Sequence, residues 1–252
     1  MYPPSTQTAF VPGRDIADNV LLHMEEIDYL QAEQQPGCIL FLDFEKAYDR
    51  LDRDWLSKCM EAMQFPESSR RWVRLLLEGT MGQIVFNGGH HSRVFSIPSG
   101  CAQGSPLSPL LYVIAAQPLA ARCRQLQREG RISSIRMPGD QGEAPCCHQH
   151  ADDTTLHAET VDGVRTLLRR AVEPFCAASG AKLNFSKSQG MVLGAHPALV
   201  GPDAETGVVF VDTAVDPIKH LGVPLSVRGV SVFAQQLFEQ RLCSIGFDPL
   251  NM

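Results

Sequence analysis

The sequence predicts an α+β fold, in which a β-sheet packs on helices, because two kinds of apolar pattern share the chain. One is the continuous apolar run at residues 38–42, which is typical of a strand buried on both faces. The other is helical spacing of apolar residues, as at Ile16, Val20, Met24 and Ile27. Because both patterns recur along the chain, we expect strands and helices to share one layered core.

Proline, glycine and short polar runs divide the chain into elements, since proline lacks a backbone N–H and glycine tolerates turn conformations. The predicted elements are, in order, a helix between the 12–13 and 36–37 turns, a strand at 38–42, a short helix at 56–63, a helix between Pro66 and Gly79, a hairpin with arms 83–86 and 93–97, a helix from 106 to about 130, a polar loop at 137–145, a hairpin turning at 152–153, a helix at 161–179, and strands at 191–193 and 208–211. We expect the short helix at 56–63 and the short helix between Pro66 and Gly79 to pack on the sheet.

Local signals support several of these elements. The run Asn87-Gly88-Gly89 between two β-prone arms is a strong hairpin signal. Gly180 directly follows the helix at 161–179 and is typical of a helix C-cap. Pro118 lies well inside the long helix, so we expect it to kink or divide that helix.

The composition is that of a globular protein, because 44% hydrophobic residues in 252 suffice for a core. Neither a run of about 18 apolar residues nor a signal sequence is present, so we expect no membrane association and an intracellular location, in the nucleus or cytoplasm. The eight cysteines show no CxxC spacing and are expected to be free thiols. Only Cys146-Cys147-His148 with His150 resembles a metal cluster, and adjacent cysteines rarely chelate one zinc well.

The net charge of −6 argues weakly against nucleic-acid binding, because affinity for a polyanion comes largely from lysine and arginine. Arginines nevertheless gather at residues 70–74, 122–136 and 165–170. Each group is more often a solvated helix face than a phosphate track.

Three aspartates point to metal chemistry. Asp43 follows the strand at 38–42, whereas Asp152 and Asp153 lie between two short β-prone runs. A lone Asp-Asp pair usually marks a hairpin tip, because aspartate tolerates turn geometry. Here a strand ending in a carboxylate, a Gly-Gln-Gly-type loop and a lysine-bearing segment occur in the order of a template-directed polymerase. Two-metal phosphoryl transfer needs two divalent cations, and carboxylates from two neighbouring strands suit them because Mg²⁺ prefers oxygen ligands.

Six sequence blocks in one order carry a family resemblance. They lie at residues 7–14, 41–49, 100–109, 151–153, 182–187 and 220–222. With these blocks the chain, from Ser5 to Leu225, resembles the reverse transcriptase domain of non-LTR (LINE-type) retrotransposons. Two residues depart from the family pattern: Ala9 stands for the first glycine of Gly-Phe-x-Pro-Gly-Arg, and His150 stands where Phe or Tyr usually precedes Ala-Asp-Asp.

The resemblance implies a right-hand polymerase palm with partial fingers, built from an antiparallel sheet packed on helices. Residues 1–37 would be a partial fingers region, residues 38–225 the palm with fingers elements at about 53–97, and residues 226–252 a truncated tail toward the thumb. On this basis we expect the upstream finger strands and most of the thumb to be missing.

The resemblance also implies roles for individual residues. Asp43, Asp152 and Asp153 would be catalytic ligands of two Mg²⁺ ions, with Mn²⁺ as a substitute; Asp153 is the least direct ligand and could instead hold the turn. Lys187 would act on the pyrophosphate leaving group, although a surface lysine is the alternative. Nucleotide binding would involve Phe44, Tyr48, Gln103 and Gly104, with Tyr48 as a steric gate or else a core tyrosine. Arg14 would contact the template, and Leu221 and Gly222 would position the primer end.

The implied activity is RNA-directed DNA synthesis, in which a DNA primer is extended on an RNA template with deoxynucleoside triphosphates. The alternative is a truncated, inactive retrotransposon remnant that at most binds nucleic acid or protein. Template choice, host partners and oligomeric state are not indicated by the sequence.

Overall fold

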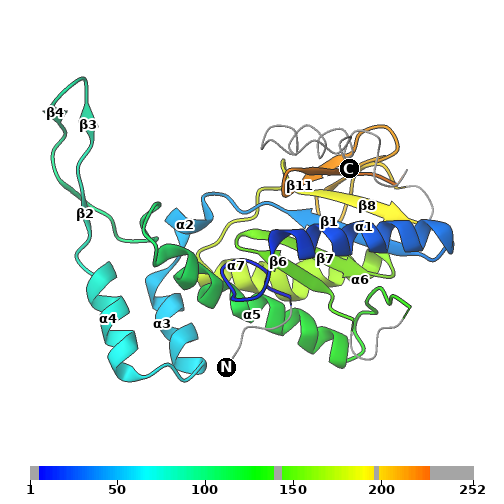
Figure 1. The fold of residues 1–252 in the computed structure, drawn as a ribbon, viewed down its shortest axis with the longest axis horizontal. Helices are drawn as coiled ribbons and strands as arrows, with labels where there is room; N and C mark the ends of the chain where they lie inside the picture. The colour runs from blue at the N-terminus through cyan, green and yellow to red at the C-terminus, as the bar shows by residue number, and fades with distance from the viewer. Residues whose placement is uncertain (1–5, 139–143, 196–198, 228–252) are drawn as a thin grey trace, which may run out of the picture.

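A six-stranded sheet with the order β6-β7-β1-β8-β10-β9 organises the computed structural model, which describes residues 6–138, 144–195 and 199–227 (Figure 1). Its strands are β1 Gly37–Leu42, β6 Cys147–His150, β7 Asp153–Ala158, β8 Gln189–Leu193, β9 Gly201–Pro202 and β10 Val209–Phe210. The pairs are antiparallel except β8 with β10, which is parallel. The predicted α+β palm is therefore confirmed, but its sheet is mixed and not wholly antiparallel.

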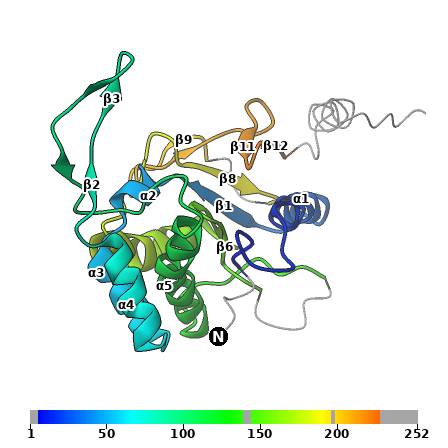
Figure 2. The same ribbon diagram turned by 60° about the vertical axis from the view of Figure 1, so that its left-hand side comes forward.

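The central position of β1 in the sheet explains why its sequence is continuously apolar. All six of its residues are buried, and it pairs with β7 on one side and β8 on the other. Cys38, Leu40 and Leu42 join the core on the side of α5, whereas Ile39 and Phe41 join the core on the side of α1 (Figure 2). A strand covered on both faces has no polar side to show in its sequence.

One face of the sheet is covered by four helical segments. They are α5 Ser108–Arg128, α6 Val161–Leu167, the π-helical turn η1 Leu168–Val172 and α7 Glu173–Ser179. Pro118 does not divide α5, which runs through it for 21 residues, so that part of the prediction is wrong. A proline removes one backbone hydrogen bond, whereas the buried face of α5 packs along its whole length.

The helix predicted at 161–179 forms, but with the π-helical turn in its middle. Pro174 has no N–H to donate to the carbonyl of Arg170, four residues earlier. Arg122 on α5 uses that carbonyl instead, through Nε at 3.1 Å. Gly180 ends the segment with φ +76°, as its sequence position predicts.

The other face is covered by α1 Ile16–Ala32 and by the small hairpin of β11 Ile218–His220 and β12 Val223–Leu225. Asp15 caps α1, because its side chain accepts a hydrogen bond from Ala17 N at 2.9 Å. Unusually, the buried side of α1 is partly polar: Asn19, His23 and Glu26 are all buried.

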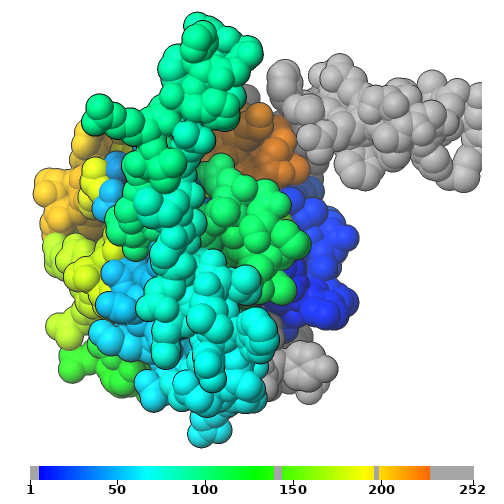
Figure 3. All heavy atoms as spheres, turned by 90° about the vertical axis from the view of Figure 1, so that its left-hand side faces the viewer, coloured from blue at the N-terminus to red at the C-terminus, as the bar shows by residue number. Residues whose placement is uncertain are grey.

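A second region lies beside the palm and is built from α2 Ala47–Arg50, α3 Arg53–Ala62, α4 Glu67–Leu77 and a long hairpin (Figure 3). Helix α3 packs on α5 and α7, and α4 packs on α3. The expectation that both short helices lie on the sheet is therefore wrong, because α3 packs on helices that themselves cover the sheet. Helix α4 lies outside α3. It has no buried residue, and the half-buried Val73 and Leu77 face the α3 layer.

The predicted hairpin at 83–97 is confirmed, with its strands interrupted. Strands β3 Val85–Phe86 and β4 His90–His91 pair at the tip, and β2 Met81–Gly82 and β5 Phe95–Ser96 pair at the base. The turn at residues 87–89 closes the tip, and the hairpin projects away from the body (Figure 1).

Parts of three predicted segments lie outside the described residues: 1–5 of the fingers region, 139–143 of the polar loop and 228–252 of the tail. Within the described chain, no helix is both long and apolar enough to cross a membrane.

Candidate active site

The ends of β1 and β7 bring the predicted aspartates together. In this antiparallel pair Leu42 lies opposite Thr154, so one further step of the register brings Asp43 opposite Asp153. Asp152 lies in the two-residue turn between β6 and β7, directly before Asp153. Opposite residues of an antiparallel pair project to the same face of a sheet. The fold therefore gathers the three acids at one end of the sheet.

The electrostatics show that these carboxyl groups interact. Burial, followed by the charges of Asp152 and Asp43, raises the pKa of Asp153 to about 6. The pKa of Asp152 is also raised, chiefly by burial and then by the charge of Asp43. Asp152 likewise contributes to the raised pKa of Tyr48, after burial. Like charges that repel in this way are relieved by a cation.

The oxygen-only donor set of the three aspartates fits Mg²⁺ rather than softer metals. Their oxygen atoms are, however, not all within 4.8 Å of one another. In the described part of the chain, the one group of three potential ligands with that spacing is Glu26, His148 and His157. The distance from Asp43 to Asp152 thus stays a prediction for the metal-bound state.

Gln7 holds the turn that carries Asp152, a role that the sequence did not reveal. Its fully buried side chain accepts hydrogen bonds at Oε1 from Ala9 N at 2.9 Å and from Ala151 N at 3.1 Å. Ala151 has φ +55°, a conformation that is strained for a residue other than glycine. Next to it, Thr8 Oγ1 is 2.9 Å from Nδ1 of His150. The first sequence block is therefore a brace for the Asp152 turn, and no local sequence signal marks this contact.

The lysine-bearing segment runs beside Asp43. Asn184 N donates to the backbone carbonyl of Asp43 at 2.8 Å, and Asp43 N donates to Ser188 Oγ at 3.1 Å. Lys187 lies between these two contacts in the chain, and its side chain is exposed. The segment is thus fixed to the strand end, and its lysine faces solvent.

The loop with Gln103 and Gly104 is joined to the segment with Tyr48. Cys101 N donates to Tyr48 O at 3.0 Å, and Gln103 Nε2 donates to Asp49 Oδ1 at 3.3 Å. The half-buried Tyr48 ring lies 5.0 Å from the ring of Tyr112, between the exposed loop and the core. Gly104 has φ +87° and open space where a Cβ would lie. This loop therefore borders the strand end that carries Asp43.

Phe44 lies differently from the other predicted nucleotide contacts. It is only 6% exposed, and its ring packs against Phe175 at 6.1 Å in the core under α7. Its side chain is a core side chain, so a nucleotide contact is open only to its backbone.

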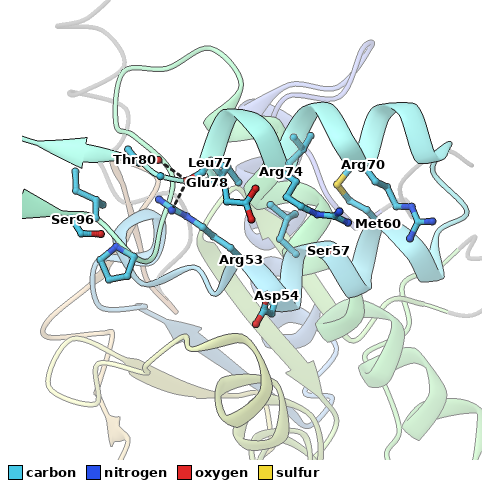
Figure 4. Close-up of a pocket in the computed structure, with 15 residues that line it drawn as sticks. Arg53, Asp54, Ser57, Met60, Arg70, Arg74, Leu77, Glu78, Thr80 and Ser96 are labelled. Atoms are coloured by element: carbon cyan, nitrogen blue, oxygen red, sulfur yellow. Dashed lines mark hydrogen bonds between the residues drawn. The ribbon is translucent and has the colours of Figure 1, made fainter.

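Arg53 joins the loop to the α3–α4 region, and its sequence position gave no sign of this role (Figure 4). Its guanidinium donates to three backbone carbonyls: Gly100 at 3.0 Å, Leu77 at 2.5 Å and Ser99 at 3.3 Å. Thr80 Oγ1 shares the Leu77 carbonyl at 2.6 Å. A planar group with several donors can hold three segments at once.

Beside Arg53, a cavity of about 340 Å³ lies between α3 and α4, with Arg70 and Arg74 in its lining (Figure 4). Arg70 pairs with Glu61 at 3.2 Å and with Glu67 at 2.6 Å. This arginine therefore belongs to an ion-paired helix surface, as its sequence suggested.

The predicted template and primer residues lie on the α1 side of the molecule. The Arg14 guanidinium donates to the backbone carbonyl of Gln7, so it also braces the first block. Leu221 and Gly222, with φ +48° and +86°, form the tight turn between β11 and β12. Their approach to a nucleic acid stays a prediction.

Comparison with known proteins places the chain in a family. The family described as reverse transcriptase (RNA-dependent DNA polymerase) matches residues 3–225. A transposon TX1 protein of 149 kDa from Xenopus laevis is 27% identical over 237 residues, which are 94% of this chain and 17% of that protein. The Pol polyprotein of the type-2 retrotransposable element R2DM from Drosophila melanogaster is 27% identical over 88% of this chain and 21% of its own length. The chain thus spans about a fifth of these relatives.

Solved structures show the same fold at low sequence identity. Apo telomerase from Candida tropicalis, truncated from its C-terminal domain, has a TM-score of 0.56 at 14% identity, covering 81% of this chain and 40% of that one. Telomerase from Candida albicans in complex with a TWJ fragment of telomeric RNA has a TM-score of 0.55 at 14% identity, covering 95% and 39%. The family match covers most of the chain, and its relatives include mobile-element proteins, which confirms the resemblance to non-LTR retrotransposons. This chain belongs to the reverse transcriptase family.

Proposed function

We propose that the chain is the catalytic palm of an RNA-directed DNA polymerase, in which Asp43, Asp152 and Asp153 hold two Mg²⁺ ions. The observation that carries this proposal is the β1–β7 register, which leads to Asp43 and Asp153 at neighbouring strand ends. The raised pKa values of Asp152 and Asp153 support it, because burial and mutual repulsion are what a cation site relieves. When bound, such ions activate the primer hydroxyl and neutralise the triphosphate charge.

The residues around this strand end would bind the incoming deoxynucleoside triphosphate. Tyr48 would present its ring to the sugar, and Gln103 and Gly104 would lie against the nucleotide, since glycine permits close approach. Lys187 would offer a mobile ammonium group to the leaving pyrophosphate. Phe44 would contribute through its backbone alone, because its ring is in the core.

The nucleic-acid substrates would be an RNA template and a DNA primer. Arg14 would contact the template strand, and the Leu221-Gly222 turn would support the primer end. Residues 1–37 would belong to the fingers, 38–225 to the palm and 226–252 to the start of a thumb. Because the chain spans about a fifth of its relatives, we assign this activity to the larger protein that carries the domain, acting inside the cell.

Primer extension by that larger protein tests the proposal. Asp43→Asn and Asp152→Asn should each reduce DNA synthesis on an RNA template by several orders of magnitude, because an amide cannot replace a carboxylate as a cation ligand. Asp28→Asn on the exposed side of α1 is the matched control and should retain activity. Synthesis by either active-site variant at the control rate contradicts the assignment. If the wild-type protein binds primed RNA but extends nothing under any divalent ion, the inactive-remnant alternative is correct.

A separate measurement tests the role of Tyr48. Tyr48→Ala should raise the kcat/KM for ribonucleotides relative to deoxynucleotides, because the ring excludes the 2′-hydroxyl sterically. Tyr48→Phe should leave the ratio nearly unchanged, since the ring remains. If Tyr48→Ala lowers both values equally, Tyr48 is a packing residue against Tyr112 and not a gate.

A further inference from the structure

A second cluster of potential metal ligands lies on the α1 side of the sheet, within the protein. Glu26 comes from α1, His148 from β6 and His157 from β7, and they are only 3%, 6% and 0% exposed. One ligand atom from each lies within 4.8 Å of the other two. Side chains of this kind are seldom buried together without a partner that uses their lone pairs.

The hydrogen-bond network assigns the protons of this cluster. Nδ1 of His23 contacts the backbone carbonyl of Asn19, which can only accept, so this nitrogen carries a proton. Burial lowers the pKa of His23 to about 4, so the ring is neutral and its Nε2 accepts from the Thr155 hydroxyl at 2.9 Å. The same hydroxyl oxygen then accepts from Nε2 of His157, also at 2.9 Å.

This chain of contacts leaves Nδ1 of His157 without a proton. That nitrogen faces Oε2 of Glu26 at 2.7 Å. The His157 ring is fully buried, which disfavours a charged imidazole, so this ring is neutral as well. Two acceptor atoms at this distance need a proton or a cation between them.

His148 decides between a proton and a cation. Its ring hydrogen-bonds to the backbone carbonyl of Pro145, whereas its Nε2 has no hydrogen-bond partner among the described residues. Nε2 is therefore a lone pair inside the cluster. A proton shared by Glu26 and His157 leaves this lone pair unsatisfied, whereas a metal ion engages all three residues at once.

We propose that Glu26 Oε2, His148 Nε2 and His157 Nδ1 bind a divalent transition-metal ion such as Zn²⁺. Two imidazoles and one carboxylate form a ligand set that zinc accepts, with water in the fourth position. Thr155 is the outer partner that fixes the His157 tautomer. At metal–ligand distances near 2.0–2.1 Å, tetrahedral geometry needs Oε2 and Nδ1 to separate to about 3.3 Å, a small opening of the pair.

The site would join three elements behind the polymerase centre. Both strands of the hairpin that turns at Asp152 carry a ligand, and α1 supplies the third. The ion would thus cross-link α1 to β6 and β7. The Cys146-Cys147-His148 run contributes only its histidine, because Cys146 and Cys147 lie in the core on the opposite face, beside Cys123.

Metal binding by the full chain tests this site. The chain is unfolded in urea with a chelator, refolded with or without Zn²⁺, and analysed for bound zinc and for thermal stability, because such ions bind as folding completes. We expect one zinc per chain and a higher Tm with the metal. Co²⁺ in place of Zn²⁺ should give tetrahedral ligand-field bands without the thiolate charge-transfer band that cysteine ligands would add.

Variants separate this site from adventitious binding. His148→Gln and Glu26→Gln should abolish the Co²⁺ bands, and Thr155→Val should weaken binding roughly 10- to 100-fold, as loss of an outer partner does. His91→Gln, on the exposed hairpin, is the matched control and should bind as the wild type does.

Three results would overturn the proposal: no zinc in the refolded wild type, thiolate bands with Co²⁺, or equal binding by wild type and His148→Gln. If His148→Gln does not refold, the wild-type cobalt spectrum and the Thr155→Val affinity still decide, because both need an intact histidine-carboxylate site. An unchanged affinity in Thr155→Val then counts against the site.

Discussion

Gly100→Ala tests how tightly the Gln103 loop must lie against the segment after Asp43. Gly100 has φ +78°, and a Cβ built there would lie 2.6 Å from the backbone oxygen of Asp49. The obstacle is main chain, which cannot rotate away as a side chain can. Alanine would therefore have to push the two segments apart.

The expected cost follows from two terms. A residue with a Cβ in the left-handed region costs about 1–2 kcal/mol. Separating the segments would also weaken the bonds from Gly100 N to Leu51 O, at 2.8 Å, and from Cys101 N to Tyr48 O, at 3.0 Å. Each is worth about 0.5–1.5 kcal/mol, so Gly100→Ala should lower the free energy of unfolding by roughly 2–5 kcal/mol. That is a large share of the roughly 5–15 kcal/mol of an ordinary domain.

The matched control is Gly130→Ala. Gly130 has φ +66° and nothing within 4 Å of an added Cβ, so it should lose only the conformational term, about 1–2 kcal/mol. Urea unfolding of both variants and the wild type gives the comparison. If Gly100→Ala is no less stable than Gly130→Ala, the close approach to Asp49 carries no energetic weight, and the reasoning is refuted.

Three further predictions concern stability. Leu156→Ala, at a fully buried site beside β1, should cost about 2–5 kcal/mol in urea unfolding. Burial opposes ionisation of Asp203, but hydrogen bonds from Arg165 and Thr206 outweigh burial and lower the Asp203 pKa. Asp203→Asn should therefore lower the free energy of unfolding above pH 3.8 by about 1.5–3 kcal/mol, the typical worth of a hydrogen bond to a charged group, and its difference from the wild type should close as the pH falls further. Burial lowers the pKa of His220 to about 3, below the ordinary 6.5. Between these two pH values the unfolded chain therefore binds more protons than the folded chain, so the free energy of unfolding of the metal-free protein should fall as the pH drops below about 6.5. His220→Phe should show a smaller fall.

Much of the palm could be predicted from the sequence because its signals are local. The run at 38–42 indicates a buried strand by itself, and its place in the sheet then delivers Asp43 to the strand end. The sequence of α4 predicts a helix with an apolar stripe, but it does not indicate that α3 is the element that covers this stripe. Pro118 was expected to disrupt a helix that long-range packing holds together.

The contacts that complete the site could not be predicted from the sequence, because they join residues that are far apart in the chain. Gln7 and Ala151 are 144 positions apart, and no periodicity links them. Glu26 and His157 are likewise far apart in the chain, and only the packing of α1 on the sheet makes them neighbours. The roles of Tyr48 and Lys187 stay predictions, because they concern substrates.

The contact of Gln7 with the Ala151 turn also bears on how the chain folds. This hydrogen bond spans more than half of the sequence, and β1 likewise acquires its partner β7 only after residue 158 has been made. Pairings between distant segments form slowly, because chain closure must precede any stabilising contact. During synthesis, at about 5–20 residues per second, the apolar strand β1 would therefore wait several seconds for β7 with its edges unpaired. This topology therefore exposes the nascent protein to misfolding through the unpaired edges of β1. The β6–β7 hairpin, which forms later, is not the source of that hazard.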